Sequence, residues 1–237
     1  MIFPIDPMLD LFLPRRCPYC GRPLVPQEEG LCLECLAVLP RVHAELPDNE
    51  VEHRLLGRFP FEHATSFCYY VRQGSFGSII RQAKFSDRPW VNAQVTRIFA
   101  EELQLAASQK GVTGWPYDID VIVPIPLHLL RLLHRGYNQS APIAETLSAI
   151  WKLPVENGCL RKRRHTSSQV GLTGDERLRN EEGSFVVRHP ERLASRHVLM
   201  VDDVLTTGAT IVAAADALLE SVPGVRISVL TLALTNS

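Results

Sequence analysis

The chain has 237 residues, of which 46% are hydrophobic and 22% charged, and its formal net charge is −1. This composition excludes wholesale disorder and predicts one medium-sized domain with a small appendage. The near-neutral charge excludes a global field that attracts nucleic acid, and no window reaches the roughly 18 uninterrupted apolar residues typical of a membrane span.

The first fourteen residues are apolar but contain Asp6, Asp10 and three prolines, without a basic leader. These features argue against a secretory signal. We therefore expect a cytoplasmic protein with no insertion into a membrane.

Four of the six cysteines form two Cys-x-x-Cys pairs separated by eleven residues: Cys17, Cys20, Cys32 and Cys35. Two intervening residues allow a tight turn to direct both thiolates of a pair at one ion, and four thiolates suit a structural zinc with no open position. Disulfides are the alternative, but the absence of a secretory signal favours a reducing compartment. We expect a four-cysteine zinc module over residues 1–42, with Cys68 as a buried small residue and Cys159 as a neutral bystander.

Residues 43–58 are polar with little periodicity and are expected to be a linker to a domain over residues 59–237. In that domain, apolar runs alternate with segments of helical spacing. The expected strands are 64–71, 119–123, 184–187, 197–201 and 225–232, and the expected helices are 75–85, 91–109, 139–151 and 210–221. Residues 154–180 carry many charges and three glycines and are expected to form a long mobile loop. The alternation indicates an α/β fold with an open, mostly parallel twisted sheet.

The segment from Val198 to Thr210 reads VLMVDDVLTTGAT. Its apolar run sets two acids at the carboxyl end of a central strand, which is the edge where ligands bind in open α/β sheets. The residues that follow lead directly into a helix, and their N–H groups, hydroxyls and helix dipole suit a phosphate. A glycine among them lets the backbone approach an anion without a Cβ in the way. The candidate residues are Asp202, Asp203, Thr206, Thr207, Gly208, Ala209 and Thr210.

The two acids suit a different partner from the phosphate. An ionised carboxylate only accepts hydrogen bonds, so the hydroxyls of a ribose diol are its natural ligands. One sugar phosphate would satisfy both parts of the segment. The alternative is an ordinary strand–turn–helix with threonine caps and exposed acids.

This segment resembles the binding motif of type I phosphoribosyltransferases, which is an apolar strand followed by two acids and a Thr/Gly loop. The resemblance implies that Asp202 and Asp203 hold ribose hydroxyls and that Thr206 to Thr210 hold the 5-phosphate of phosphoribosyl pyrophosphate. It also implies Mg²⁺ beside the pyrophosphate, because this hard cation prefers oxygen ligands and bridges phosphates.

Three further stretches narrow the resemblance. They are VPIPLHLLRLLHRGYNQS over Val123 to Ser140, LRKRRHTSSQVGL over Leu160 to Leu172, and ERLRNEEGSF over Glu176 to Phe185. Together with the four-cysteine module and Lys84-Phe85, their order is similar to the ComF family of bacterial competence-associated proteins. The resemblance implies a phosphoribosyltransferase-type domain and an association with DNA uptake during natural transformation. Single-stranded DNA and DNA-uptake proteins are then candidate partners.

Two more groups are candidate ligand contacts at the same sheet edge. They are the loop of Pro124, Ile125 and Pro126, and the pre-helix residues Arg135, Asn138 and Gln139. The backbone of the first group could receive the pyrophosphate, and a plain proline-rich turn is the alternative. The side chain of Asn138 suits a helix cap equally well.

A basic run follows in the place where phosphoribosyltransferases have a flexible catalytic loop. It contains Arg161, Lys162, Arg163 and Arg164. Cations that close over pyrophosphate would stabilise charge on the leaving group. The alternative is a solvated run of surface charge.

Two hypotheses about function follow. The first is a phosphoribosyltransferase with an unknown acceptor, since no segment indicates a purine, pyrimidine or amine. The second is a non-catalytic protein that senses the donor or binds single-stranded DNA. Aromatic residues among the basic ones would favour stacking of bases, but none lies around Arg161 and Tyr137 is the sole candidate near Arg135. Glutamine amidotransfer is not expected, because Cys17 is assigned to zinc.

Overall fold

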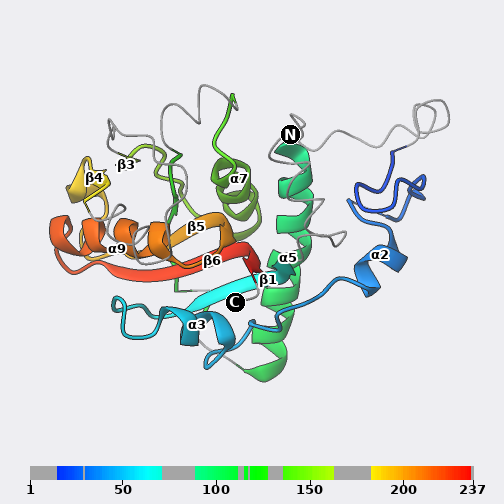
Figure 1. Ribbon diagram of the computed structural model, residues 1–237, viewed down its shortest axis with the longest axis horizontal. Helices are drawn as coiled ribbons and strands as arrows, with labels where there is room; N and C mark the ends of the chain where they lie inside the picture. Colours follow the sequence, from blue (N-terminus) through cyan, green and yellow to red (C-terminus); the bar gives the residue numbers. More distant parts are fainter. Residues whose placement is uncertain are drawn as a thin grey trace.

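A parallel four-stranded sheet forms the centre of the computed structural model, which describes residues 15–28, 30–70, 89–111, 115–116, 118–127, 136–162 and 183–235 (Figure 1). Its order is β1-β6-β5-β2, and every neighbouring pair is parallel. The strands are β1 (Ala64–Tyr70), β2 (Val121–Pro124), β5 (His197–Leu205) and β6 (Arg226–Thr235). The expected α/β fold with a mostly parallel sheet is confirmed.

Helices cover both faces of this sheet. On one face, α5 (Pro89–Lys110) and α7 (Ser140–Trp151) pack in a cluster that includes Phe99 and Leu147. On the other face, α9 (Ala209–Ser221) and α3 (Glu50–Leu55) pack in a second cluster that includes Leu218. The strands are buried on both sides, which explains why Val198 to Val201 of β5 form a continuous apolar run rather than an alternating one.

The segment expected as a linker contains a helix. The helix α3 begins after Asn49, whose side-chain oxygen accepts hydrogen bonds from the N–H groups of Val51 (2.9 Å) and Glu52 (3.1 Å). Val51 and Leu55 are fully buried against the sheet. The polar composition concealed this short helix, because only Val51 and Leu55 among its six residues are buried apolar side chains. Asn49 is the cap that could have revealed it.

Part of the segment expected as a long loop over residues 154–180 is a strand instead. Residues Leu160–Lys162 form strand β3, which pairs antiparallel with β4 (Phe185–Val187) in a separate two-stranded sheet. Residues 163–182 lie outside the described residues, as does the helix expected at 75–85.

The four-cysteine module packs directly on α5. Gly30 lies against Gln94, so closely that a Cβ on the glycine would come within 2.8 Å of the Gln94 Cβ. Arg41 then fixes the chain after α2 (Leu33–Ala37): its guanidinium donates to Glu102 on α5 at 2.6 and 3.0 Å and lies over the Phe67 ring. The module is therefore attached to the sheet domain by packing as well as by the chain.

None of the helices within the described ranges combines the length and apolar character needed to span a bilayer.

Candidate functional site

The two acids lie at the carboxyl end of the central strand β5. They form its sixth and seventh residues, so the strand continues past them to Leu205 rather than ending before them. Asp202 is partly exposed and Asp203 is 7% exposed. The Asp202 carboxylate accepts hydrogen bonds from its neighbour's N–H, at 2.8 Å, and from the hydroxyl of Ser140, at 3.0 Å. This carboxylate is thus held in position by the first residue of α7.

The loop from Thr206 to Thr210 joins β5 to α9 at the same edge. Thr206 and Thr207 are exposed, whereas Gly208 and Ala209 are buried. The first main-chain hydrogen bond of the helix runs from the Val212 N–H to the Gly208 carbonyl, at 2.9 Å. The Ala209 N–H approaches the Thr207 hydroxyl at 3.4 Å. The first N–H groups of a helix have no partner in its own hydrogen-bond ladder, and such groups suit an anion.

The structure explains the glycine at position 208 in a second way, besides the close approach of an anion that the sequence suggested. Its φ angle is +79°, in the left-handed region that favours glycine. A Cβ there would come within 2.8 Å of the Arg58 guanidinium and 3.1 Å of Leu55. The missing side chain therefore makes room for the segment after α3, rather than only for a ligand.

Arg58 is a residue of the site that the sequence did not reveal. Its guanidinium donates a hydrogen bond to the carbonyl of Thr207, across 149 positions of the chain. No local signal marks this contact, because it depends on where α3 packs against the sheet.

The proline-containing loop lies beside the acids. Pro124 ends β2 opposite Val201, and the Ile125 N–H donates to the Val201 carbonyl at 2.9 Å. Asn138 does not cap the next helix. Its side-chain amide donates to the Ile125 carbonyl at 3.1 Å, and it ties the two loops together.

The helix α7 begins at this point. Gln139 is its N-cap residue, without a side-chain capping bond, and is 1% exposed. Its carbonyl accepts from the Asn92 amide of α5 at 3.4 Å. Three of the predicted contact segments therefore converge at one sheet edge, while Arg135 lies outside the described residues.

The basic run is only partly described. Arg161 and Lys162 lie in β3 rather than in a loop, because Arg161 pairs with Val186 and Lys162 with Phe185. Arg161 is exposed, and the Lys162 ammonium lies 5.1 Å from the centre of the Phe185 ring. Arg163 and Arg164 lie outside the described residues.

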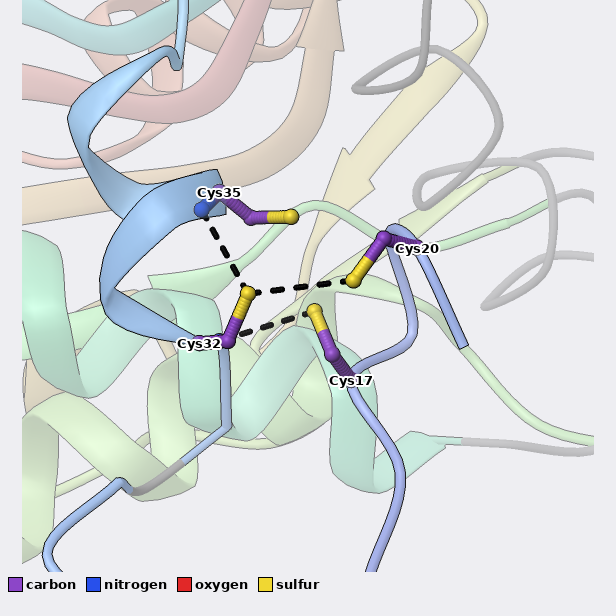
Figure 2. A group of neighbouring side chains, drawn as sticks. All are labelled: Cys17, Cys20, Cys32 and Cys35. Carbon is purple, nitrogen blue, oxygen red and sulfur yellow. Dashed lines mark hydrogen bonds between the residues drawn. The ribbon is translucent and has the colours of Figure 1, made fainter. Parts of the chain in front are cut away.

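The four cysteines of the N-terminal module surround a common point (Figure 2). Their sulfur atoms all lie within 4.8 Å of one another, and the Cys20 and Cys32 sulfurs are 3.7 Å apart. A tetrahedral zinc with Zn–S bonds of about 2.3 Å requires sulfur separations of about 3.8 Å. All six cysteines lie within the described residues, and all six are free. The donor set therefore fits one structural zinc, as the spacing predicted.

Backbone and side-chain donors support these ligands. The Cys32 N–H points at the Cys17 sulfur at 3.5 Å, and the Cys35 N–H points at the Cys32 sulfur at 3.4 Å. Burial alone would raise the pKa of Cys32, but hydrogen bonds from Arg22 and Cys35 outweigh it and lower the pKa to about 6. These hydrogen bonds favour the thiolate of Cys32, the form in which cysteine binds zinc, whereas burial raises the pKa values of Cys17 and Cys35.

A buried carboxylate, that of Glu28, stabilises the segment between the two Cys-x-x-Cys pairs. Glu28 is 3% exposed, and it accepts hydrogen bonds from the Leu33 N–H at 2.9 Å, from the Val25 N–H at 3.0 Å and from Arg22 at 2.5 Å. The hydrogen bonds from these two N–H groups lower the pKa of Glu28, and the charge of Arg22 adds a smaller effect in the same direction. Glu28 therefore holds the segment between the cysteine pairs in its metal-binding shape.

Fold and site together define a class. A mostly parallel sheet whose central strand carries two acids and continues through a threonine–glycine loop into a helix is the fold of the type I phosphoribosyltransferases, here with a four-cysteine module before it. Residues 8–46 match the model of the double zinc ribbon domain, and this segment contains four cysteines, enough for one tetrahedral site.

Curated relatives narrow the class to a family. The DNA utilization protein YhgH of Salmonella typhi is 31% identical over 86% of this chain and 84% of its own length. Competence protein F of Haemophilus influenzae is 31% identical over 56% of this chain and 57% of its own length. The chain belongs to the ComF family, which includes these proteins.

Among solved structures, adenine phosphoribosyltransferase of Saccharomyces cerevisiae is similar with a TM-score of 0.35 and 20% identity, over 66% of this chain and 74% of that one.

Proposed function

We propose that the edge of the sheet at β5 binds phosphoribosyl pyrophosphate. The observation that carries the proposal is the arrangement of Asp202, Asp203 and the loop of Thr206 to Thr210 in one continuous strand–loop–helix, with Ser140 orienting the first acid. Carboxylates suit the ribose hydroxyls, and the N–H groups at the start of α9 suit the 5-phosphate.

The pyrophosphate end of the same molecule extends toward the loop of Pro124, Ile125 and Pro126. That loop is fixed by the hydrogen bonds of Ile125 to β5 and to Asn138. Gln139 and Arg135, from the segment that follows, are further proposed contacts for the pyrophosphate. Arg161, Lys162, Arg163 and Arg164 are the proposed cations for the pyrophosphate, and the first two would act from strand β3.

Mg²⁺ is the proposed cofactor, because the site offers ionised carboxylates and the ligand offers phosphate oxygens. When bound, it would neutralise charge on the pyrophosphate as that group departs. The chain's own residues would hold the ribose at the acids and the 5-phosphate in the loop, and so keep the anomeric carbon in place.

Transfer, if an acceptor is present, breaks the bond between the anomeric carbon and the pyrophosphate oxygen. The pyrophosphate leaves with the electron pair of that bond, and a nucleophilic atom of the acceptor forms the new bond to the same carbon. The protein is then a glycosyltransferase of the phosphoribosyltransferase type.

Calorimetric titration with phosphoribosyl pyrophosphate and Mg²⁺ tests the site. The wild-type chain should bind, and the double variant Asp202→Ala with Asp203→Ala should not. An unchanged affinity in the variant would remove the site assignment. A screen for pyrophosphate release across candidate acceptors then identifies the transfer reaction.

A role in the use of incoming DNA is the second proposal, and it is favoured by the names of the relatives, a DNA utilization protein and a competence protein. Direct contact with single-stranded DNA would use exposed cations such as Arg161. Titration of an oligonucleotide across salt concentrations tests this contact, because phosphate binding weakens steeply as salt rises. Absence of salt-dependent binding would remove DNA as a direct partner.

A further inference from the structure

Arg58 contacts the threonine–glycine loop (Thr206 to Thr210) from the side on which α3 lies. It comes just after that helix, between the fully buried Leu55 and the buried Phe59. Its N–H bonds to the Leu55 carbonyl at 3.1 Å, so the backbone at this turn is fixed before the side chain begins. The guanidinium then reaches the Thr207 carbonyl.

The orientation of this contact matters for an anion. In a trans peptide, the carbonyl and the following N–H point to opposite sides. Because Arg58 holds the Thr207 carbonyl on the α3 side, the Gly208 N–H of the same peptide is directed away from α3. The carbonyl is also available for this role, because the first bond of α9 uses the Gly208 carbonyl instead.

The charge of Arg58 is only weakly compensated. Burial lowers its pKa, while the negative charge of Asp216 opposes that shift. Within the described part of the chain, its Nη2 atom is buried and has no hydrogen-bond partner. A cation of this kind next to a loop stabilises a negative charge bound there, since partly buried charges are poorly screened.

We propose that Arg58 is a positioning residue of the 5-phosphate site, which turns the Thr207–Gly208 peptide toward the anion and places a positive charge behind it. This inference rests on the proposed function and deepens it, because it makes the site selective for a ribose that carries a 5-phosphate. Arg58 acts through the loop and does not itself touch the ligand.

Titration with ribose 5-phosphate tests the role of Arg58. The variant Arg58→Gln keeps a donor but loses the charge, and it should bind ribose 5-phosphate about tenfold more weakly than the wild type, as expected for a lost charged hydrogen bond. Its affinity for Mg²⁺-pyrophosphate alone should not change, because that group contacts a different loop. Arg58→Lys should restore part of the lost affinity.

Arg54→Gln is the matched control. It removes the same charge four residues earlier, where the guanidinium contacts Glu50 and the Thr235 carbonyl, and it should leave the affinity for ribose 5-phosphate unchanged. Equal affinities in Arg58→Gln and the wild type would overturn the inference while the proposed function stands. An equal loss for ribose 5-phosphate and pyrophosphate would also overturn it, since that result indicates general damage.

A second measurement separates the inference from the proposed function. Hydrogen exchange of the ligand-free protein should be faster at residues 205–212 in Arg58→Gln than in the wild type, and as slow as wild type in Arg54→Gln. If the wild type binds neither ribose 5-phosphate nor phosphoribosyl pyrophosphate, the proposed function fails and the selectivity for a 5-phosphate fails with it. Unchanged exchange at residues 205–212 would overturn the positioning role in either case.

Discussion

Ser140, the first residue of α7, donates a hydrogen bond to Asp202 near the end of β5, with 3.0 Å between the hydroxyl and carboxylate oxygens. The two residues are 62 positions apart and come from different elements. Ser140 is 1% exposed, so water does not replace its hydroxyl readily. The contact therefore fixes the orientation of one of the two acids before any ligand arrives.

Ser140→Ala should weaken binding of phosphoribosyl pyrophosphate by about tenfold, because a hydrogen bond to a charged group contributes about 1.5–3 kcal/mol. Ser148→Ala is the control: this hydroxyl on the same helix donates to the Leu153 carbonyl at 2.6 Å, away from the acids. Calorimetry on both variants checks the prediction. An equal effect of the two substitutions would show that Ser140 acts only through the stability of α7.

Zinc content should depend on the four clustered cysteines alone. The purified chain should carry about one zinc, and Cys32→Ser should lose it because three thiolates no longer complete the tetrahedron. Burial, followed by a hydrogen bond to Glu156, raises the pKa of Cys159 to about 11, so this thiol is neutral. Cys159→Ser should keep full zinc in metal analysis, and loss of zinc in that variant would contradict the assignment.

Removal of the metal should also affect the rest of the protein. The module packs on α5 through Gly30, and Arg41 bonds to Glu102. A chelator should therefore lower the melting temperature of the sheet domain, measured by tryptophan fluorescence or calorimetry. An unchanged transition after complete zinc loss would indicate that the module is only tethered.

Gly208→Ala should destabilise the fold by about 2–4 kcal/mol, because left-handed strain and the clash with Arg58 and Leu55 add. Gly111 provides the comparison: its φ is +63°, and a Cβ there meets nothing within 4 Å. Gly111→Ala should cost only about 1 kcal/mol, which is the strain alone. Denaturant unfolding measures both values. Similar costs would mean that the contact between the loop and the α3 segment is unimportant.

Glu52 should make stability depend on pH. Its carboxylate accepts from the N–H groups of Asp48 (2.6 Å) and Ala64 (3.2 Å), and it lies 3.6 Å from His63. Burial alone would raise its pKa, but His63 and these N–H groups outweigh burial and lower the pKa from 4.5. A lowered folded-state pKa stabilises the protein above pH 4.5, and this contribution is lost as the pH falls through the folded-state value.

Glu52→Gln should therefore cost about 1–2 kcal/mol at pH 5.5, and the difference from wild type should shrink as the pH falls below 4.5. Glu62 is exposed on the chain just before β1. Glu62→Gln is the control and should cost less than about 0.5 kcal/mol at pH 5.5, as expected for a surface substitution. Urea unfolding at several pH values measures the difference. A constant difference down to pH 3 would contradict the lowered pKa.

The sequence predicted the sheet and its ligand edge because those signals are local. Buried parallel strands are rich in apolar, β-branched and aromatic residues. The strands predicted at 64–71, 197–201 and 225–232 therefore lie close to β1, β5 and β6. The spacing of the four cysteines is likewise a local signal, and it predicts that their sulfur atoms lie close together, as the structure shows. The strand β5 is longer than predicted because its ladder with β6 continues past the acids to Leu205.

Other features depend on contacts between distant segments, and local patterns do not contain them. The short helix α3 is stable because Val51 and Leu55 meet the sheet, and its polar exposed side looked like a linker. The strand β3 exists only through its pairing with β4. Asn138 bonds to Ile125 instead of capping a helix, and the contact of Arg58 with the loop follows from the position of α3.

The most direct test of the central claim is a crystal structure of the chain with phosphoribosyl pyrophosphate and Mg²⁺. The account predicts the 5-phosphate enclosed by the N–H groups of Thr206 to Thr210, with the ribose hydroxyls on Asp202 and Asp203. A ligand bound with its 5-phosphate at any other part of the chain, or with its ribose away from both acids, would contradict it.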